Sequence, residues 1–552
     1  MRRSLIPEES EILESISKAE KSDTFLSRVM QRDVVPEGVL RLKDINSLGG
    51  MRYIAPLLFH SKQKVRELAL QRVHELFLQA DDNDLNWLDE SMRGGYLYRY
   101  ELDALKKWSS LSVDMISGLN CSGGELVSAL SVLSCHRNGY IREAALRRLV
   151  DVDMFTATRM LLIRVNDWVR SIRNLAVTTL TENIGVLDES LITRFLVLVD
   201  QLRKRSRHDH TQLISIVEER LSSVSGQTAL IKAVADTDFR MARSAFQLSR
   251  KVMADKEKVL EFGARHTDPL IRSWSLNLAL EYLNGDQLIE YLLDSSGDQL
   301  GALRKRSIYK LIDLDYQLAR QPLIDCLCAP GATMRNFARF YLNREEGFDC
   351  ADFYRKQLLE IDNNLLAGAI LGLSETGAEE DWGKVLAYEH HNLPKVRAAV
   401  VAASARLAKE QCDWLLAKVV NGCPAEIKAA KHALILLDGV DIMELHDIHK
   451  ANFRGLQGRV LRQLIVKKDY WLAAELILQA IVDGDGEGKD EFDMELGSWL
   501  GRYGRMYWFV KPDTKVLPNI VNLSRVIESK YDGSVNVSSL RKMVKRLLTD
   551  GS

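Results

Sequence analysis

The chain has 552 residues, which is too long for one compact core, because single hydrophobic cores stop growing at roughly 250–300 residues. Hydrophobic residues make up 46% of the sequence and charged residues 27%, values that exclude a disordered chain. The 75 Lys and Arg residues nearly cancel the 76 Asp and Glu residues, which argues against a protein coated with nucleic acid along its whole length. Only 10 prolines occur, which favours helices.

The N-terminal segment and the cysteines indicate the compartment. Arg2 and Arg3 are followed by Glu8, Glu9 and Glu11 rather than by an apolar stretch, so residues 1–23 are not expected to be a signal peptide. No run of 18 apolar residues occurs, and the seven cysteines are scattered. We therefore expect no membrane segment, no disulfide framework and a cytoplasmic location.

In chain order, residues 1–54 are predicted to form an N-terminal helical cap, and residues 55–500 a repeat array. The repeat signature begins irregularly, in KVRELAL around Arg66, YIREAAL around Arg142 and WVRSIRNL around Arg170. Within 230–470 it becomes most regular. There a basic residue recurs at steps of 32, 32, 31, 62, 31 and 31 residues, at Arg240, Arg272, Arg304, Arg335, Arg397, Lys428 and Arg459. Residues 501–552 are predicted to form a C-terminal helical cap.

Each repeat is predicted to be a helical hairpin. Apolar residues stand just before most of the basic residues, with Gly458 as the exception, and in most repeats again three, four and seven positions later, which is one face of a helix. Pro269 and Pro394 stand three residues before Arg272 and Arg397, where proline fits a first helical turn. A second amphipathic stretch fills the rest of each period. A period of about 31 residues accommodates two helices of about 12 residues and two short turns.

The segments 167–170 (DWVR), 268–272 (DPLIR) and 394–399 (PKVRAA) resemble the HEAT-repeat (armadillo-like) family of α-solenoids, in particular its short bacterial subtype. The resemblance covers about four-fifths of the chain. The predicted fold is therefore all-α: a right-handed α-solenoid superhelix of about 13 HEAT-like hairpins with helical caps. The family includes scaffolds, adaptors, transport receptors, enzyme subunits and a few DNA-repair enzymes, so the resemblance does not select a function.

The recurring basic residues form what we call the predicted ladder: Arg66, Arg142, Arg170, Arg240, Arg272, Arg304, Arg335, Arg397, Lys428 and Arg459. An arginine in the first turn of a helix faces the positive end of the helix dipole, so its recurrence needs a reason. We interpret the ladder as mainly structural, with each arginine paired to an acidic or amide residue of a neighbouring turn, an arrangement that the resemblance also implies. The alternative is a row of guanidinium groups facing an anionic polymer.

The densest basic run contains Arg203, Lys204, Arg205 and Arg207. It falls between two repeats and is predicted to be an exposed loop. Such a loop could bind phosphate groups or an acidic partner, and the alternative is a solvated loop without a ligand. A second basic group in 538–548 is interpreted as part of the C-terminal cap.

No motif for a cofactor, metal or catalytic site was found. The acidic loop at 483–491 resembles a calcium loop, but Met494 stands where the bidentate glutamate belongs. The aromatic stretch at 94–100 is interpreted as packing, with an interface as the alternative. No metal or cofactor is expected.

The sequence thus favours a non-catalytic scaffold or adaptor that binds a macromolecular partner, most simply a protein, along a concave groove. Two alternatives stay open. One is a nucleic-acid-binding protein or a subunit of a DNA- or RNA-processing complex, and the other is an enzyme whose site is assembled from scattered residues.

Overall fold

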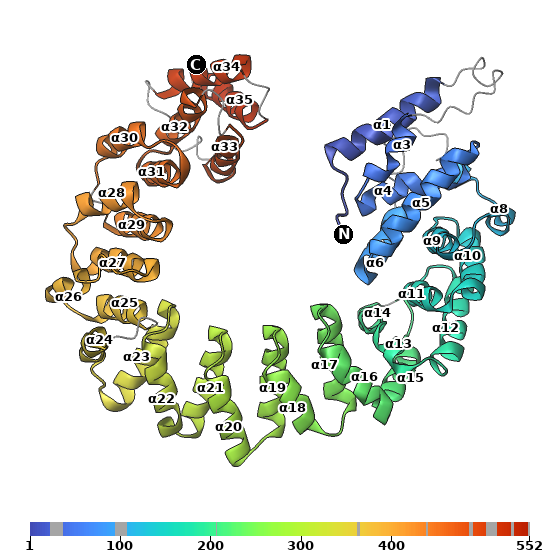
Figure 1. Ribbon diagram of the computed structural model, residues 1–552, viewed down its shortest axis with the longest axis horizontal. Coiled ribbons are helices and arrows are strands. Elements are labelled where there is room, and N and C mark those ends of the chain that lie inside the picture. The colour runs from blue at the N-terminus through green and yellow to red at the C-terminus, as the bar shows by residue number, and fades with distance from the viewer. Residues whose placement is uncertain are drawn as a thin grey trace. The chain divides into compact units, whose positions relative to one another are not determined.

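The computed structural model describes residues 1–22, 37–93, 107–205, 207–360, 365–437, 440–484, 489–503, 516–530 and 535–549. Every regular element within these ranges is a helix. The chain divides into two compact units, Met1–Asn284 and Gly285–Ser552, and within each unit consecutive helices pack as hairpins (Figure 1). The chain is therefore an all-α helical-repeat solenoid, as predicted from the period.

The first unit runs from the N-terminus to the end of α19. Its helices are α1 (Pro7–Ser22), α3 (Glu37–Leu40), η1 (Arg41–Asp44), α4 (Leu48–Ile54), η2 (Ala55–Phe59), α5 (Gln63–Gln79), α6 (Asp82–Arg93), α8 (Val113–Ser117), α9 (Gly123–Leu133), α10 (Gly139–Val152), α11 (Met154–Arg164), α12 (Arg170–Ile184), α13 (Glu189–Thr193), α14 (Leu196–Leu202), α15 (Thr211–Ser222), α16 (Val224–Val234), α17 (Phe239–Val252), α18 (Lys256–Ala264) and α19 (Pro269–Tyr282).

The second unit continues with the same alternation. Its helices are α20 (Gly285–Ser295), α21 (Gly301–Leu314), α22 (Tyr316–Leu327), α23 (Ala332–Glu346), α24 (Cys350–Leu359), α25 (Leu366–Thr376), η4 (Glu379–Asp381), α26 (Trp382–Leu386), α27 (Pro394–Leu407), α28 (Cys412–Asn421), α29 (Pro424–Leu437), α30 (Ile442–Ala451), α31 (Gly455–Lys468), α32 (Tyr470–Asp483), α33 (Lys489–Tyr503), α34 (Val516–Lys530) and α35 (Val535–Thr549).

The helix starts follow from local chemistry. Asp255, Asp315 and Asp349 each precede a first helix of a hairpin and accept a backbone N–H of its first turn, which satisfies a donor that has no partner within the helix. The second helices α19 and α27 begin at Pro269 and Pro394, as the sequence predicts. The region between α12 and α16 is irregular. It contains three helices, α13, α14 and α15, and α14 packs against both α11 and α17.

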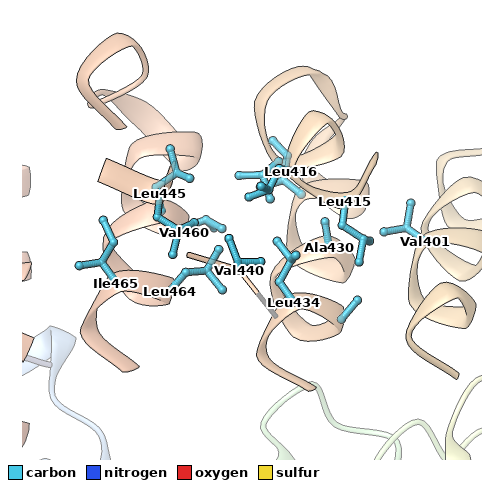
Figure 2. Close-up of a cluster of buried hydrophobic side chains, with 14 of the residues drawn as sticks. Val401, Leu415, Leu416, Ala430, Leu434, Val440, Leu445, Val460, Leu464 and Ile465 are labelled. Atoms are coloured by element: carbon cyan, nitrogen blue, oxygen red, sulfur yellow. The ribbon is translucent and has the colours of Figure 1, made fainter. Parts of the chain in front are cut away.

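The core of unit 2 is continuous from one hairpin to the next rather than gathered at one centre. Figure 2 shows Val401, Leu415, Leu434, Leu445 and Leu464, which come from the successive helices α27 to α31 and are all buried. Helices α25, α27, α29 and α31 also pack against one another in that order. Each hairpin thus buries its apolar surface only against its neighbours, which is the packing of a solenoid.

Helix α25 has no arginine at the ladder position and instead approaches its neighbours closely through glycine. A Cβ atom on Gly368 would lie 1.9 Å from the carbonyl oxygen of Cys328, and one on Gly372 would lie 2.2 Å from the Tyr354 ring. Only glycine therefore fits at these two positions. The cap boundaries at 54 and 500, the count of about 13 hairpins and the right-handed sense stay predictions.

Candidate functional site

More than half of the ladder side chains turn back toward the loop that precedes their own helix. Six of the ten donate to the carbonyl oxygen of the residue six positions earlier, at 2.7–3.1 Å. They are Arg66, Arg142, Arg272, Arg304, Arg335 and Arg397. Each is the fourth residue of its helix. The guanidinium thus bonds carbonyls at the end of the preceding turn, which compensates for its place near the positive end of its own helix dipole.

Several of these turns are also joined to the next hairpin by a carboxylate. Arg142 donates from Nε and Nη2 to the two oxygens of Asp167 at 3.0 and 2.7 Å. Arg335 pairs likewise with Glu375, and Arg397 with Glu426. Arg142 and Arg335 are buried, so each is a charge-assisted contact in a low-dielectric site. Glu375 and Glu426 lie within helices α25 and α29, whereas the sequence interpretation placed the acidic partners in the turns.

The other four ladder residues do not make this turn contact. Arg170 and Lys428 are exposed, Arg240 pairs with Asp81, and Arg459 pairs with Glu491. In three of these helices an arginine three residues later has the internal role. Arg173 donates to the carbonyls of Asp167 and Trp168, Arg243 pairs with Asp268, and Arg462 pairs with Glu495. The predicted register is therefore shifted by three residues in α12, α17 and α31.

Four of the turns share a histidine that the sequence interpretation missed. The pattern is His-x5-Arg, in residues 60–66, 136–142, 266–272 and 391–397. In each turn the histidine Nδ1 accepts the backbone N–H two residues later, at 2.9–3.1 Å, and the histidine carbonyl accepts from the arginine. The bonded Nδ1 places the proton on Nε2, and Nε2 of His136 and His266 lies 2.9 Å from a backbone carbonyl oxygen.

The basic loop after α14 does not project uniformly into solvent. Arg203 and Lys204 are exposed, and Arg203 pairs with Glu218. Arg205 instead points inward, donating to the Asn86 side chain and to the Ile163 carbonyl. Arg207 stacks on the Trp168 ring, with its guanidinium carbon 4.2 Å from the ring centroid. The four residues that the sequence grouped together therefore lie in two different environments.

A buried ion cluster lies beneath this loop. Arg164 is 1% exposed and pairs with Asp89 and with Asp167. Burial alone would raise the pKa of Asp167, but the hydrogen bond from Arg142 and the charge of Arg164 lower it to about 2. Burial lowers the pKa of Arg205, although the charges of Asp89 and Glu90 act in the opposite direction, and Arg205 forms no ion pair with a carboxylate among the described residues.

Charge is segregated between the two layers of unit 2. The second-helix layer, α21, α23, α25, α27, α29 and α31, contains sixteen Lys and Arg against five Asp and Glu. The first-helix layer, α20, α22, α24, η4 with α26, α28, α30 and α32, contains six Lys and Arg against thirteen Asp and Glu. The formal charges are +11 and −7, although the whole chain carries only −1.

Many cations of the second-helix layer are accessible. Its exposed basic residues include Lys305, Arg306, Arg344, Lys395, Arg406 and Lys428. Two of its carboxylates form ion pairs within the fold: Glu426, which is buried, and Glu375, whose side chain is 9% exposed. The other three, Asp313, Glu345 and Glu346, are exposed, and Glu345 pairs with Arg344. Exposed cations outnumber exposed carboxylates, so the accessible side of this layer carries a net positive charge.

Four aromatic rings lie together on this same layer, at Tyr309, Phe337, Phe340 and Tyr341, which we call the aromatic patch. The Phe337 and Phe340 ring centroids both lie 5.1 Å from that of Tyr341, and Tyr309 lies 6.0 Å from Tyr341. Tyr309 and Phe340 are about half exposed, at 49% and 57%. Lys305 lies over Phe337, and Arg344 over Phe340 and Tyr341. The patch thus offers apolar area bordered by cations.

The remaining features that the sequence suggested do not contribute to a candidate site among the described residues. Residues 94–100 and part of the acidic loop at 483–491 lie outside the described residues. Within the described ranges no group of three His, Cys, Asp or Glu is placed to bind a metal ion. None of the helices there is long and apolar enough to span a bilayer.

No family model matches the sequence, and no curated protein matches it. Among solved structures the chain is similar to Kap121p bound to Pho4p, with 10% identity, a TM-score of 0.28, and coverage of 94% of this chain and 59% of that one. It is also similar to importin beta, with 11% identity, a TM-score of 0.30, and coverage of 98% and 79%. A circular tandem repeat protein matches with 14% identity and a TM-score of 0.12, over 99% and 98% of the two chains. Similarities this distant establish neither a shared partner nor a shared activity.

Proposed function

We propose that the protein is a non-catalytic helical-repeat scaffold that binds an acidic segment of a protein partner on the second-helix layer of unit 2. The observation that carries the proposal is the charge segregation between the two layers of this unit. A surface of one sign attracts a partner of the opposite sign and accelerates its association. The opposite layer would repel the same segment, so the segregation also orients the partner.

The aromatic patch supplies the second requirement of a protein interface. Aromatic and arginine side chains contribute most of the binding energy at interfaces when they lie at the centre of the contact. Phe340 and Tyr309 are accessible, Arg344 lies over Phe340, and Lys305 lies over the neighbouring ring of Phe337. A partner segment with an apolar side chain between carboxylates would satisfy both features.

The test is capture of partners from the source cells by tagged protein, comparing charge reversals on the two layers. The test variant carries Lys305→Glu and Arg344→Glu. The control carries Lys356→Glu, on the first-helix layer, and Lys356 is exposed. We expect the test variant to lose the proteins that the wild type and the control retain, and those proteins to contain acidic segments. Equal retention by all three, with no enrichment of acidic segments, contradicts the proposal.

A second candidate is single-stranded nucleic acid, because accessible rings bordered by cations also stack bases and bind phosphates. The measurement is fluorescence anisotropy of labelled single-stranded DNA between about 50 and 300 mM salt. Binding that falls steeply with salt and is lost in the charge-reversed double variant would favour nucleic acid. Absence of binding at low salt excludes it.

A further inference from the structure

A polar cavity lies in unit 1 beneath the basic loop. It measures about 190 Å³ and is lined by α6, by the end of α11 and by the loop after α14, with Asn86, Asp89, Arg93, Asn166, Arg205 and Arg207 among its walls. One buried water needs roughly 10–15 Å³ by the same measure. The cavity therefore has room for a small molecule.

The side chains around the cavity carry an excess of positive charge. Four arginines meet there, Arg93, Arg142, Arg164 and Arg205. Asp89 and Asp167 pair with the first three, and the remaining carboxylate of the walls, Glu90, is exposed. Arg205 is the residue left over, since both of its hydrogen-bond acceptors are neutral. A charge that is largely removed from water and forms no ion pair is costly, and an anion in the cavity would lower that cost.

The hydrogen-bonding groups of the cavity also match an oxyanion. A guanidinium has five N–H donors, and the contacts of Arg205 and Arg207 with protein use only some of them. Arg207 is positioned by its stack on Trp168. The side-chain oxygen of Asn166 receives no hydrogen bond from the described residues, so it can accept one from a hydroxyl group of the ligand.

We propose that this cavity is a binding site for a small phosphate-type oxyanion, with Arg205 and Arg207 donating to the anion and Asn166 accepting from a hydroxyl group of the ligand. Arginine is the residue suited to such ligands, because its planar fork donates two parallel hydrogen bonds. The ligand class is a free phosphate or the monoester phosphate of a small metabolite, since the enclosure of the cavity favours a small molecule over a polymer.

The loop itself provides matched variants for the test. Isothermal titration calorimetry with inorganic phosphate, at low salt in a phosphate-free buffer, should show saturable binding to the full-length protein. Hydrogen bonds to charged groups are worth about 1.5–3 kcal/mol, so Arg205→Ala and Arg207→Ala should each weaken binding by about tenfold or more. Arg203→Ala removes the same charge from the same loop but lies outside the cavity, and should change affinity by less than about twofold.

If Arg205→Ala destabilises the fold, Arg207→Ala still tests the site, because Arg207 is exposed and its removal should leave the fold intact. Circular dichroism of each variant confirms that it is folded. Saturable binding lost in the two cavity variants and kept in Arg203→Ala supports the site. No saturable binding, or equal weakening by all three variants, overturns it, because general attraction to a basic loop would not distinguish Arg203 from Arg205.

A second titration distinguishes free phosphate from the phosphate group of an organic monoester. A nucleoside monophosphate that binds more tightly than inorganic phosphate, with the same loss in Arg207→Ala, identifies an organic phosphate as the ligand. Equal or weaker binding identifies free phosphate. A single-stranded oligonucleotide that binds through Arg203 and Arg205 alike would overturn the small-molecule site.

Discussion

The turns between helices and the accessible face of the second helices in unit 2 are both rich in arginine, but these arginines serve different ends. Helix α23 contains one of each kind. Arg335, its fourth residue, is buried and bonds two turn carbonyls and Glu375. Arg344, further along the helix, is half exposed and lies over Phe340 and Tyr341. Position within the helix, rather than residue type, thus separates an arginine that builds the fold from one that is available to a partner.

The sharpest test of this difference lies within helix α10. Arg142→Ala removes a buried partner of Asp167 and two turn contacts, and should lower the free energy of unfolding of unit 1 by about 3 kcal/mol. Arg147→Ala, which breaks an exposed pair with Glu143, should change it by less than about 0.5 kcal/mol. Urea denaturation, with hydrogen exchange of the α10–α12 amides, measures both. If the two variants lost similar amounts of unfolding free energy, arginines bonded to the turns would stabilise the fold no more than arginines on the exposed helix face.

Acid should reveal the same buried pair. The pKa of Asp167 is lowered from 3.8 to about 2 in the folded chain. Its ionised form therefore stabilises the fold by about 2 kcal/mol above pH 4, and this contribution is lost as the pH falls from about 4 toward 2. Stability curves of the wild type and of Asp167→Asn should converge over that window. Curves that stay parallel would show that Asp167 does not titrate with folding.

The smallest expected difference in stability is between variants of two arginines of α12, Arg170 and Arg173. Arg173→Ala removes hydrogen bonds to the carbonyls of Asp167 and Trp168, and should cost about 1–2 kcal/mol. Arg170→Ala removes an exposed side chain and should lie within about 0.5 kcal/mol of the wild type. Thermal unfolding of the two variants checks the pair. A larger loss of stability in Arg170→Ala than in Arg173→Ala would instead support Arg170 as the structural residue, as the sequence suggested.

The fold was predictable because its cause is periodic. Apolar positions at helical spacing and a basic residue every 31 or 32 residues define the hairpins directly. The register in α12 was not predictable in the same way. Arg170 and Arg173 are one helical turn apart, so both fit the same periodic face, and only the start of the helix at Arg170 decides which of them reaches the turn.

The candidate sites were less accessible to sequence reasoning. Arg203 and Arg205 are two residues apart, and whether a loop residue points into a cavity depends on helices distant in the sequence, here α6 and α11. The charge segregation of unit 2 had a readable signal, since summing the charges of alternate helices gives it once their boundaries are known. That the alternate helices pack side by side in one layer, and so place their charges on one surface, is a property of the folded chain (Figure 1).

The His-x5-Arg turn has a consequence for how such a chain changes over time. Its defining hydrogen bonds, from the arginine to the histidine carbonyl and from the backbone to Nδ1, lie within seven consecutive residues. A copied or deleted hairpin therefore brings or removes its own closing bonds and leaves the remaining turns intact. Inserting or deleting whole hairpins therefore leaves the hydrogen bonds of the remaining turns in place. Related chains with the same turn but different numbers of hairpins are expected to fold.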